Sequence, residues 1–184
     1  RGNSSTEPVG PGSSVRKAKV AGGATGVSSH VPEYKINLSV AKKLRKELES
    51  RGYKVVMIRT KNNVNISNKI ANKSGADIYV RIHADSSASS SVRGASALYP
   101  STKNRYVGKL SAKSKKLSQY MLNSYCKKTG IRSRGLSLRD DLTGTNWSKI
   151  PVTLIEMGFL SNPTEDRYMQ KKSTQNKMAK GMAD

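Results

Sequence analysis

The sequence predicts an α/β fold, in which a single domain contains a mixed, mostly parallel sheet with helices on both faces. Three observations support this prediction. Short runs rich in β-branched residues, typical of buried strands, alternate with longer segments whose apolar residues recur every three or four positions, typical of helices. A short connection between two of the strands indicates that the sheet is mixed. The length of 184 residues suits one domain with a substantial core.

The chain divides at residue 32. Residues 1–32 are rich in Gly, Ser and Pro, so we predict loops that border the functional site. A helix is predicted over residues 33–50, because Pro32 suits its start and Gly52 suits its end. The apolar face of this helix consists of Tyr34, Leu38, Ala41, Leu44 and Leu48.

Strands and helices then follow one another to the end of the chain. The first of the strands, Lys-Val-Val-Met-Ile-Arg at residues 54–59, is predicted to be buried. All the strands are predicted over residues 54–59, 77–83, 94–99, 135–139 and 151–156. Helices are predicted over residues 65–74, over residues 109–129 and from Asn162 to the end.

Composition limits the classes of protein that this chain can be. Hydrophobic residues make up 35% of it, the mean hydropathy is −0.62, and no apolar run approaches the roughly 18 residues that cross a membrane. Cys126 is the only cysteine, which excludes an internal disulfide and a cysteine-based metal site.

The net charge of +22 is extreme and unevenly distributed. No acidic residue lies between Asp85 and Asp140, whereas that interval contains Arg93, Lys103, Arg105, Lys109, Lys113, Lys115, Lys116, Lys127, Lys128, Arg132, Arg134 and Arg139. A positive surface of this kind is either a solvated face or a surface that attracts polyanions, which include nucleic acid, wall polymers and anionic membranes.

Two predicted strands each end at a side chain that can carry chemistry. His83 ends one strand and Glu156 ends the other, and functional sites in α/β sheets form at the carboxyl ends of strands. A histidine and a glutamate there suit metal-assisted hydrolysis, which needs a ligand and a base. The alternatives are a structural histidine and a glutamate paired with a Lys or Arg.

Three motifs, taken in order, resemble the zinc-dependent N-acetylmuramoyl-L-alanine amidases of bacterial cell-wall turnover, in particular the type 3 catalytic domain. They are a glutamate that opens a helix within residues 32–38, Ile-His-Ala at residues 82–84, and Leu-Ile-Glu-Met-Gly-Phe-Leu-Ser-Asn at residues 154–162. The last motif is the most specific, and the resemblance covers nearly the whole chain.

The resemblance implies that residues 33–184 are an amidase catalytic domain, truncated at both ends. It implies Zn²⁺ as the cofactor, Glu33 and His83 as metal ligands, and Glu156 as the general base. Glu33 has another interpretation, a favourable charge at the start of a helix, and both are compatible. The family's first ligand is a histidine in an Asp-Pro-Gly-His-type motif, which we expect before Arg1.

Three further residues have open roles. His30 lies three residues before Glu33 and could complete a metal site, although we expect it to be a surface or substrate-groove residue. Asp85 stands where the family usually has Asn, so it either orients a ligand or is a neutral substitution. Trp147 either covers the edge of the core or forms a stacking platform for sugar or peptide.

The expected function is therefore hydrolysis of the amide between N-acetylmuramic acid and L-alanine in peptidoglycan, by an autolysin-type enzyme secreted to the cell wall. The expected partners are peptidoglycan and, through the basic surface, anionic wall polymers. We expect a monomer without a membrane span, and no nucleic acid partner, since one Phe and one Trp offer little base stacking. Two alternatives remain: a non-catalytic basic domain that binds wall polymer or nucleic acid, and another zinc hydrolase with the same fold.

Overall fold

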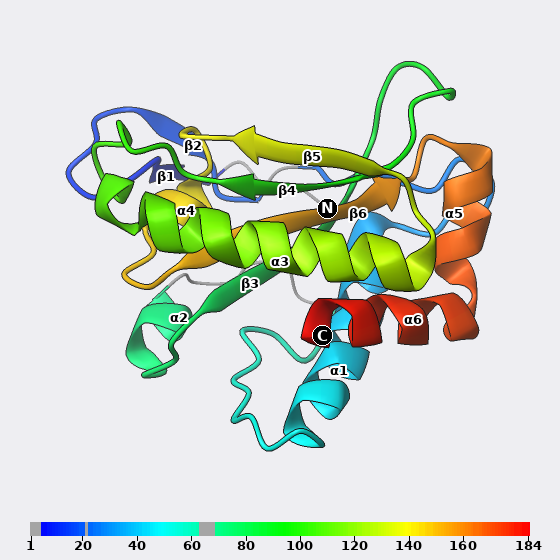
Figure 1. The fold of residues 1–184 in the computed structure, drawn as a ribbon. Coiled ribbons are helices and arrows are strands. Elements are labelled where there is room, and N and C mark those ends of the chain that lie inside the picture. Colours follow the sequence, from blue (N-terminus) through cyan, green and yellow to red (C-terminus); the bar gives the residue numbers. More distant parts are fainter. Residues whose placement is uncertain (1–4, 21, 63–68) are drawn as a thin grey trace.

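The computed structural model describes residues 5–20, 22–62 and 69–184. It confirms the predicted α/β class: a mixed four-stranded sheet with the order β3-β6-β4-β5 is flanked by helices (Figure 1). The strands are β3 (Tyr79–Asp85), β4 (Ala95–Tyr99), β5 (Ser133–Leu138) and β6 (Val152–Phe159). Within the described residues, no helix is long and apolar enough to cross a membrane.

Strand β6 lies in the middle of the sheet and sets the position of Glu156. It runs parallel to β3, with His83 paired to Glu156, and antiparallel to β4, with Ser96 paired to Glu156. Strands β4 and β5 are parallel to each other. Paired residues point to the same face of a sheet, so His83, Glu156 and Ser96 share one face.

The long helices cover the opposite face. They are α1 (Glu33–Glu49), α3 (Ser111–Thr129), which follows a short 3₁₀ turn η1 (Gly108–Leu110), and α6 (Lys172–Ala183). Figure 1 shows α3 along the front of the sheet, with α6 beside it. The core between these layers includes Ile36, Val40 and Leu44 of α1, Leu122 and Tyr125 of α3, Met178 of α6, and Ile155 and Met157 of β6.

The ends of the helices follow the sequence signals. Pro32 precedes α1, and Gly130 ends α3 in the left-handed conformation (φ 75°). Asn162 caps α5 (Pro163–Gln170), because its side chain accepts hydrogen bonds from the backbone N–H groups of Thr164 and Glu165. The last predicted helix is therefore two helices, separated at Lys171.

The face that carries Glu156 is covered by smaller elements. Arg81 of β3 lies against the short helix α4 (Thr143–Asn146), since a Cβ on Gly144 would be 2.6 Å from the Arg81 guanidinium carbon. A hairpin of β1 (Thr6–Pro8) and β2 (Arg16–Ala18) attaches nearby, where the Trp147 indole donates to the Pro8 carbonyl at 3.0 Å. The prediction of loops alone over residues 1–32 was thus incomplete, because part of this region pairs with itself.

The predicted buried strand over residues 54–59 was wrong. The segment is irregular, and Val56 is 45% exposed. A β-branched run becomes a strand only when a neighbour accepts its backbone hydrogen bonds, and in the described sheet this segment pairs with no strand. Of the helix predicted over residues 65–74, the structure has α2 (Lys69–Lys73), and residues 65–68 lie outside the described residues.

Candidate active site

Glu33 and His83 meet at the carboxyl end of β3. Glu33 is the first residue of α1, and its Oε1 lies 2.9 Å from Nδ1 of His83. The same oxygen accepts hydrogen bonds from the side chain of Asn37 at 2.8 Å and from the Ala84 backbone at 3.3 Å. The second carboxylate oxygen accepts from the Ala24 backbone at 3.3 Å. The sequence-predicted pair is therefore brought together, and it is held from several directions.

These contacts control the charge of Glu33. Burial raises the pKa of its carboxyl, but the hydrogen bond and charge of His83 and the bonds from Asn37 and Ala84 lower it more, so the pKa lies below its usual range. Gly23 allows the loop to approach, because a Cβ at this position would lie 2.8 Å from Oε2 of Glu33. Glu33 is thus a stable anion at neutral pH.

Glu156 has a different environment on the neighbouring strand. It is mostly buried, and within the described residues no donor reaches its Oε2. Burial, together with the negative charges of Asp85 and Glu33, raises the pKa of Glu156 to about 8, although Arg81 and Arg139 partly oppose this. A buried carboxylate oxygen without a partner indicates a group that acts on something absent from the protein itself.

A β-bulge adjoins Glu156. His83 pairs with Glu156 but Asp85 pairs with Phe159, so β6 has one extra residue here. Gly158 adopts φ 153°, and a Cβ there would lie 3.0 Å from the Glu165 carboxylate. Bulges of this kind redirect side chains beside active sites.

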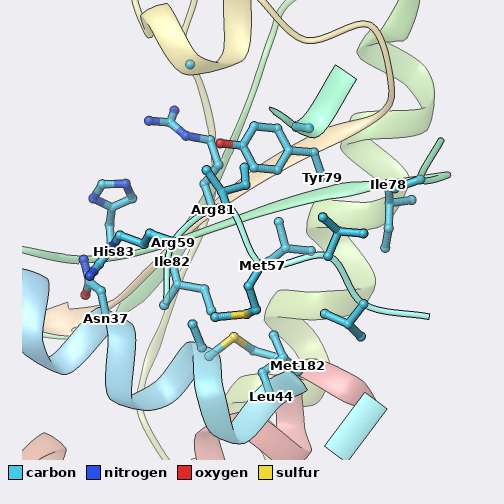
Figure 2. A pocket seen from close by; sticks show the side chains of 18 of the residues that line it. Asn37, Leu44, Met57, Arg59, Ile78, Tyr79, Arg81, Ile82, His83 and Met182 are labelled. Carbon is cyan, nitrogen blue, oxygen red and sulfur yellow. The ribbon is translucent and has the colours of Figure 1, made fainter. Parts of the chain in front are cut away.

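Two cavities are lined by the candidate site residues. The larger, of about 1250 Å³, runs along the outer edge of β3 and contains Glu33 and His83. Figure 2 shows Leu44, Met57, Ile82 and Met182 on one side of it and Tyr79, Arg81 and His83 on the other. The smaller, of about 370 Å³, contains Glu156 and Asp85 and extends across β4 to β5. The first could hold a cation at His83, and the second a substrate at Glu156.

His83 and Glu33 offer the types of ligand atom that zinc binds. An imidazole nitrogen and a carboxylate oxygen are ordinary zinc ligands, and the two side chains are in direct contact. The set is incomplete, however: among the described residues, no group of three or more His, Cys, Asp or Glu side chains could hold a metal ion.

The residues with open roles now have positions. His30 is exposed in a turn with φ 55° and lines neither cavity, so it does not join Glu33 and His83. Asp85 accepts the Ser86 backbone N–H at 2.7 Å and faces the Glu156 cavity. Trp147 anchors the β1–β2 hairpin through its indole N–H, which favours the structural interpretation.

Sequence reasoning missed Asn37 and Arg139. Asn37 lies one helical turn after Glu33, so the i, i+4 spacing could have revealed it. Arg139 follows β5 and lines both cavities, and Asp141 holds its guanidinium with bonds of 2.7 and 2.9 Å. No local sequence signal indicates that Arg139 reaches the cavity of Glu156.

Proteins that resemble this chain in sequence and fold include amidases. The family model described as N-acetylmuramoyl-L-alanine amidase matches residues 7–184. The N-acetylmuramoyl-L-alanine amidase LytC of Bacillus subtilis is 26% identical over 155 residues, which are 83% of this chain. This chain spans only 30% of the length of LytC.

Solved structures agree with this assignment. The CwlD amidase of Clostridioides difficile, solved with the GerS lipoprotein, has a TM-score of 0.78 and 27% identity, and the match covers 88% of this chain and 87% of that one. The amidase Ami1 of Mycobacterium smegmatis, at 22% identity, shares the fold, with a TM-score of 0.84 over 97% of this chain and 85% of that one. The chain belongs to the N-acetylmuramoyl-L-alanine amidase family.

Proposed function

We propose that the chain hydrolyses the amide between N-acetylmuramic acid and L-alanine in peptidoglycan, and that it does so with zinc. The observation that carries the proposal is the unpartnered oxygen of Glu156 on the strand beside the His83–Glu33 pair, in a chain of this family. The zinc would be held by Glu33 and His83 together with a further ligand outside the described residues.

The protein's own groups then have separate tasks. Bound zinc supplies activation of a water molecule and polarisation of the amide carbonyl. Glu156 accepts a proton from the attacking water and returns it to the leaving amine of L-alanine. Asn37 and the Ala84 backbone fix the Glu33 carboxylate, and the Glu33 contact in turn orients the His83 ring.

The basic surface supports a place in the cell wall. Helix α3 contains no acidic residue, and its exposed side includes Lys113, Lys116 and Lys127. We propose that these charges attract anionic wall polymers, and that the protein acts after secretion. The attraction would weaken with salt, because exposed charges are screened over roughly 8–10 Å.

The test is digestion of purified peptidoglycan by the wild type and by Glu156→Gln, alongside measurement of zinc per chain for the wild type and His83→Ala. The proposal expects new L-alanine amino groups without new reducing ends, loss of digestion in Glu156→Gln, and about one zinc in the wild type only. New reducing ends would contradict the bond assignment. Digestion that survives metal removal would contradict the role of zinc. Polymer binding without digestion in any condition would favour the non-catalytic alternative.

A further inference from the structure

The smaller cavity places two arginines from the β5 segment beside the Glu156 carboxylate. Its walls include Arg134, Arg139, Ser96 and Ser137, and Glu156 and Asp85 carry its negative charges. Ser96 of β4 pairs with Glu156 of β6, and β4 pairs with β5, so the cavity runs from the middle of the sheet to the β5 edge. The cavity therefore combines two carboxylates from β3 and β6 with two guanidinium groups from the β5 segment.

Arg139 is held in place without using all its donors. Its backbone N–H donates to the Tyr99 carbonyl at 3.0 Å, and its Nε and Nη2 donate to Asp141. Asp141 is itself fixed by Lys17 of the hairpin at 3.3 Å. A guanidinium has five N–H donors, so the fork to Asp141 leaves further donors for a ligand.

Arg134 is a second cation in the same cavity. Its guanidinium lies 5.2 Å from the centre of the Phe159 ring and donates to the Arg93 carbonyl at a long 3.4 Å. Within the described residues, no carboxylate forms an ion pair with Arg134. Arg134 thus brings to the cavity a positive charge that is not neutralised by an ion pair with the carboxylates of the lining.

We propose that Arg134 and Arg139 bind a carboxylate of the stem peptide, namely that of the residue after L-alanine. This inference rests on the proposed function. The residue after L-alanine in peptidoglycan is a D-glutamate whose α-carboxyl is either free or amidated. Strand β4 separates β5 from β6, so these two strands are about 9.5 Å apart, and two residues of extended peptide span about 7 Å. The long arginine side chains from the β5 segment bridge the difference, so a carboxylate held by them leaves the scissile amide near Glu156. Guanidinium groups match carboxylates by paired hydrogen bonds, which fixes the direction of the bound peptide.

The experiment compares two muramoyl dipeptides that differ only in a free or amidated α-carboxyl on the second residue. Binding is measured by calorimetry with zinc present, in a Glu156→Gln background that prevents turnover. We expect the free acid to bind roughly tenfold more tightly, the size of a lost charge-assisted hydrogen bond. Arg139→Gln and Arg134→Gln should each reduce that ratio, and Arg139→Lys should keep part of it.

Arg132→Gln is the matched control, since Arg132 is exposed on the same segment and lies outside the cavity lining. It removes the same charge and should leave the ratio unchanged. Equal binding of both dipeptides, or a ratio that survives both arginine changes, would overturn the inference and leave the proposed function intact. Binding of neither dipeptide would also overturn the inference, whereas the proposed function stands or falls with digestion of peptidoglycan by the wild type. Thermal unfolding of each variant separates a lost contact from a lost fold.

Discussion

Two glutamates of this site, Glu33 on α1 and Glu156 on β6, have opposite surroundings. Glu33 receives hydrogen bonds from His83, Asn37 and two backbone N–H groups, and the pKa of its carboxyl is low. Glu156 has an oxygen without a donor, and its pKa is raised to about 8. The difference fits the two roles proposed for them: a hydrogen-bonded anion suits holding a cation, and a carboxyl with a raised pKa suits exchanging a proton near neutral pH.

The largest expected effect comes from replacing Glu156, the carboxyl with the raised pKa. Glu156→Gln should reduce the rate of hydrolysis about 10²–10⁴-fold, because the base is missing. It should also stabilise the metal-free protein. Because the folded pKa of about 8 lies above the ordinary 4.5, the wild type loses stability as pH rises from 4.5 to 8. Gln has no such loss. The folded and ordinary pKa values differ by about 3.5, and each pKa unit is worth roughly 1.4 kcal/mol, so the variant should gain several kcal/mol in free energy of unfolding above pH 8, at most about 5, and nothing at pH 4.

Urea unfolding of the chelator-treated protein at pH 4, 6.5 and 9 measures this gain. Glu49→Gln, an exposed position at the end of α1, is the control and should show no pH-dependent gain. Equal stability of the wild type and Glu156→Gln at pH 9 would mean that the Glu156 carboxylate is adequately solvated, and the contrast with Glu33 would be lost.

Replacing Glu33, the hydrogen-bonded anion, should lower the free energy of unfolding, which is the opposite of the effect expected at Glu156. Glu33→Ala leaves the Asn37 amide and the Ala84 N–H without their acceptor, which should cost about 1–3 kcal/mol at pH 7. The lowered pKa of Glu33 means that its stabilisation is present above the unfolded pKa and is lost as pH falls through the folded pKa. The difference in free energy of unfolding between the wild type and Glu33→Ala should therefore become smaller at acidic pH.

Urea unfolding at the same three pH values measures the cost of Glu33→Ala, with Glu47→Gln as the control on the same helix. Glu47 pairs with Arg51 near the surface, where an ion pair is worth about 0–1 kcal/mol. A cost for Glu33→Ala no larger than that of Glu47→Gln would show that the contacts around Glu33 carry little energy.

The strands and the helix that carry the site residues could be predicted from the sequence, whereas their arrangement in the sheet could not. The run before His83 and the run before Glu156 predict strands because β-branched residues repeat there, and the apolar spacing after Glu33 predicts its helix. Chain order does not reveal that β6 pairs with both β3 and β4, which sets His83 beside Glu156. Residues 54–59 have the composition of a strand but no partner in the described sheet, so local pattern misled there.

A smaller effect is expected from Asp85, whose charge raises the pKa of Glu156. Asp85→Asn keeps an acceptor for the Ser86 N–H but removes the charge, so the pKa of Glu156 should fall below 8. Carbon-detected NMR titration of the Glu156 carboxyl in the metal-free protein measures the change. Asp77→Asn is the control, because Asp77 precedes β3 at the end opposite Asp85 and lies outside the lining of the Glu156 cavity. An unchanged Glu156 titration in Asp85→Asn would leave burial and Glu33 as the causes.

The smallest expected effect tests the packing around Glu33. A Cβ at Gly23 would lie 2.8 Å from Oε2 of Glu33, whereas a Cβ at Gly22 would meet nothing within 4 Å. Gly23→Ala should therefore displace either the carboxylate or the loop, at a cost of about 1 kcal/mol, and weaken zinc binding severalfold. Gly22→Ala makes the same chemical change one residue away and should leave both quantities unaltered. Competition with a zinc-binding dye and thermal unfolding measure the two effects. If both variants bind zinc like the wild type, the loop yields without moving Glu33, and the low pKa of that carboxyl owes nothing to the close approach of residue 23.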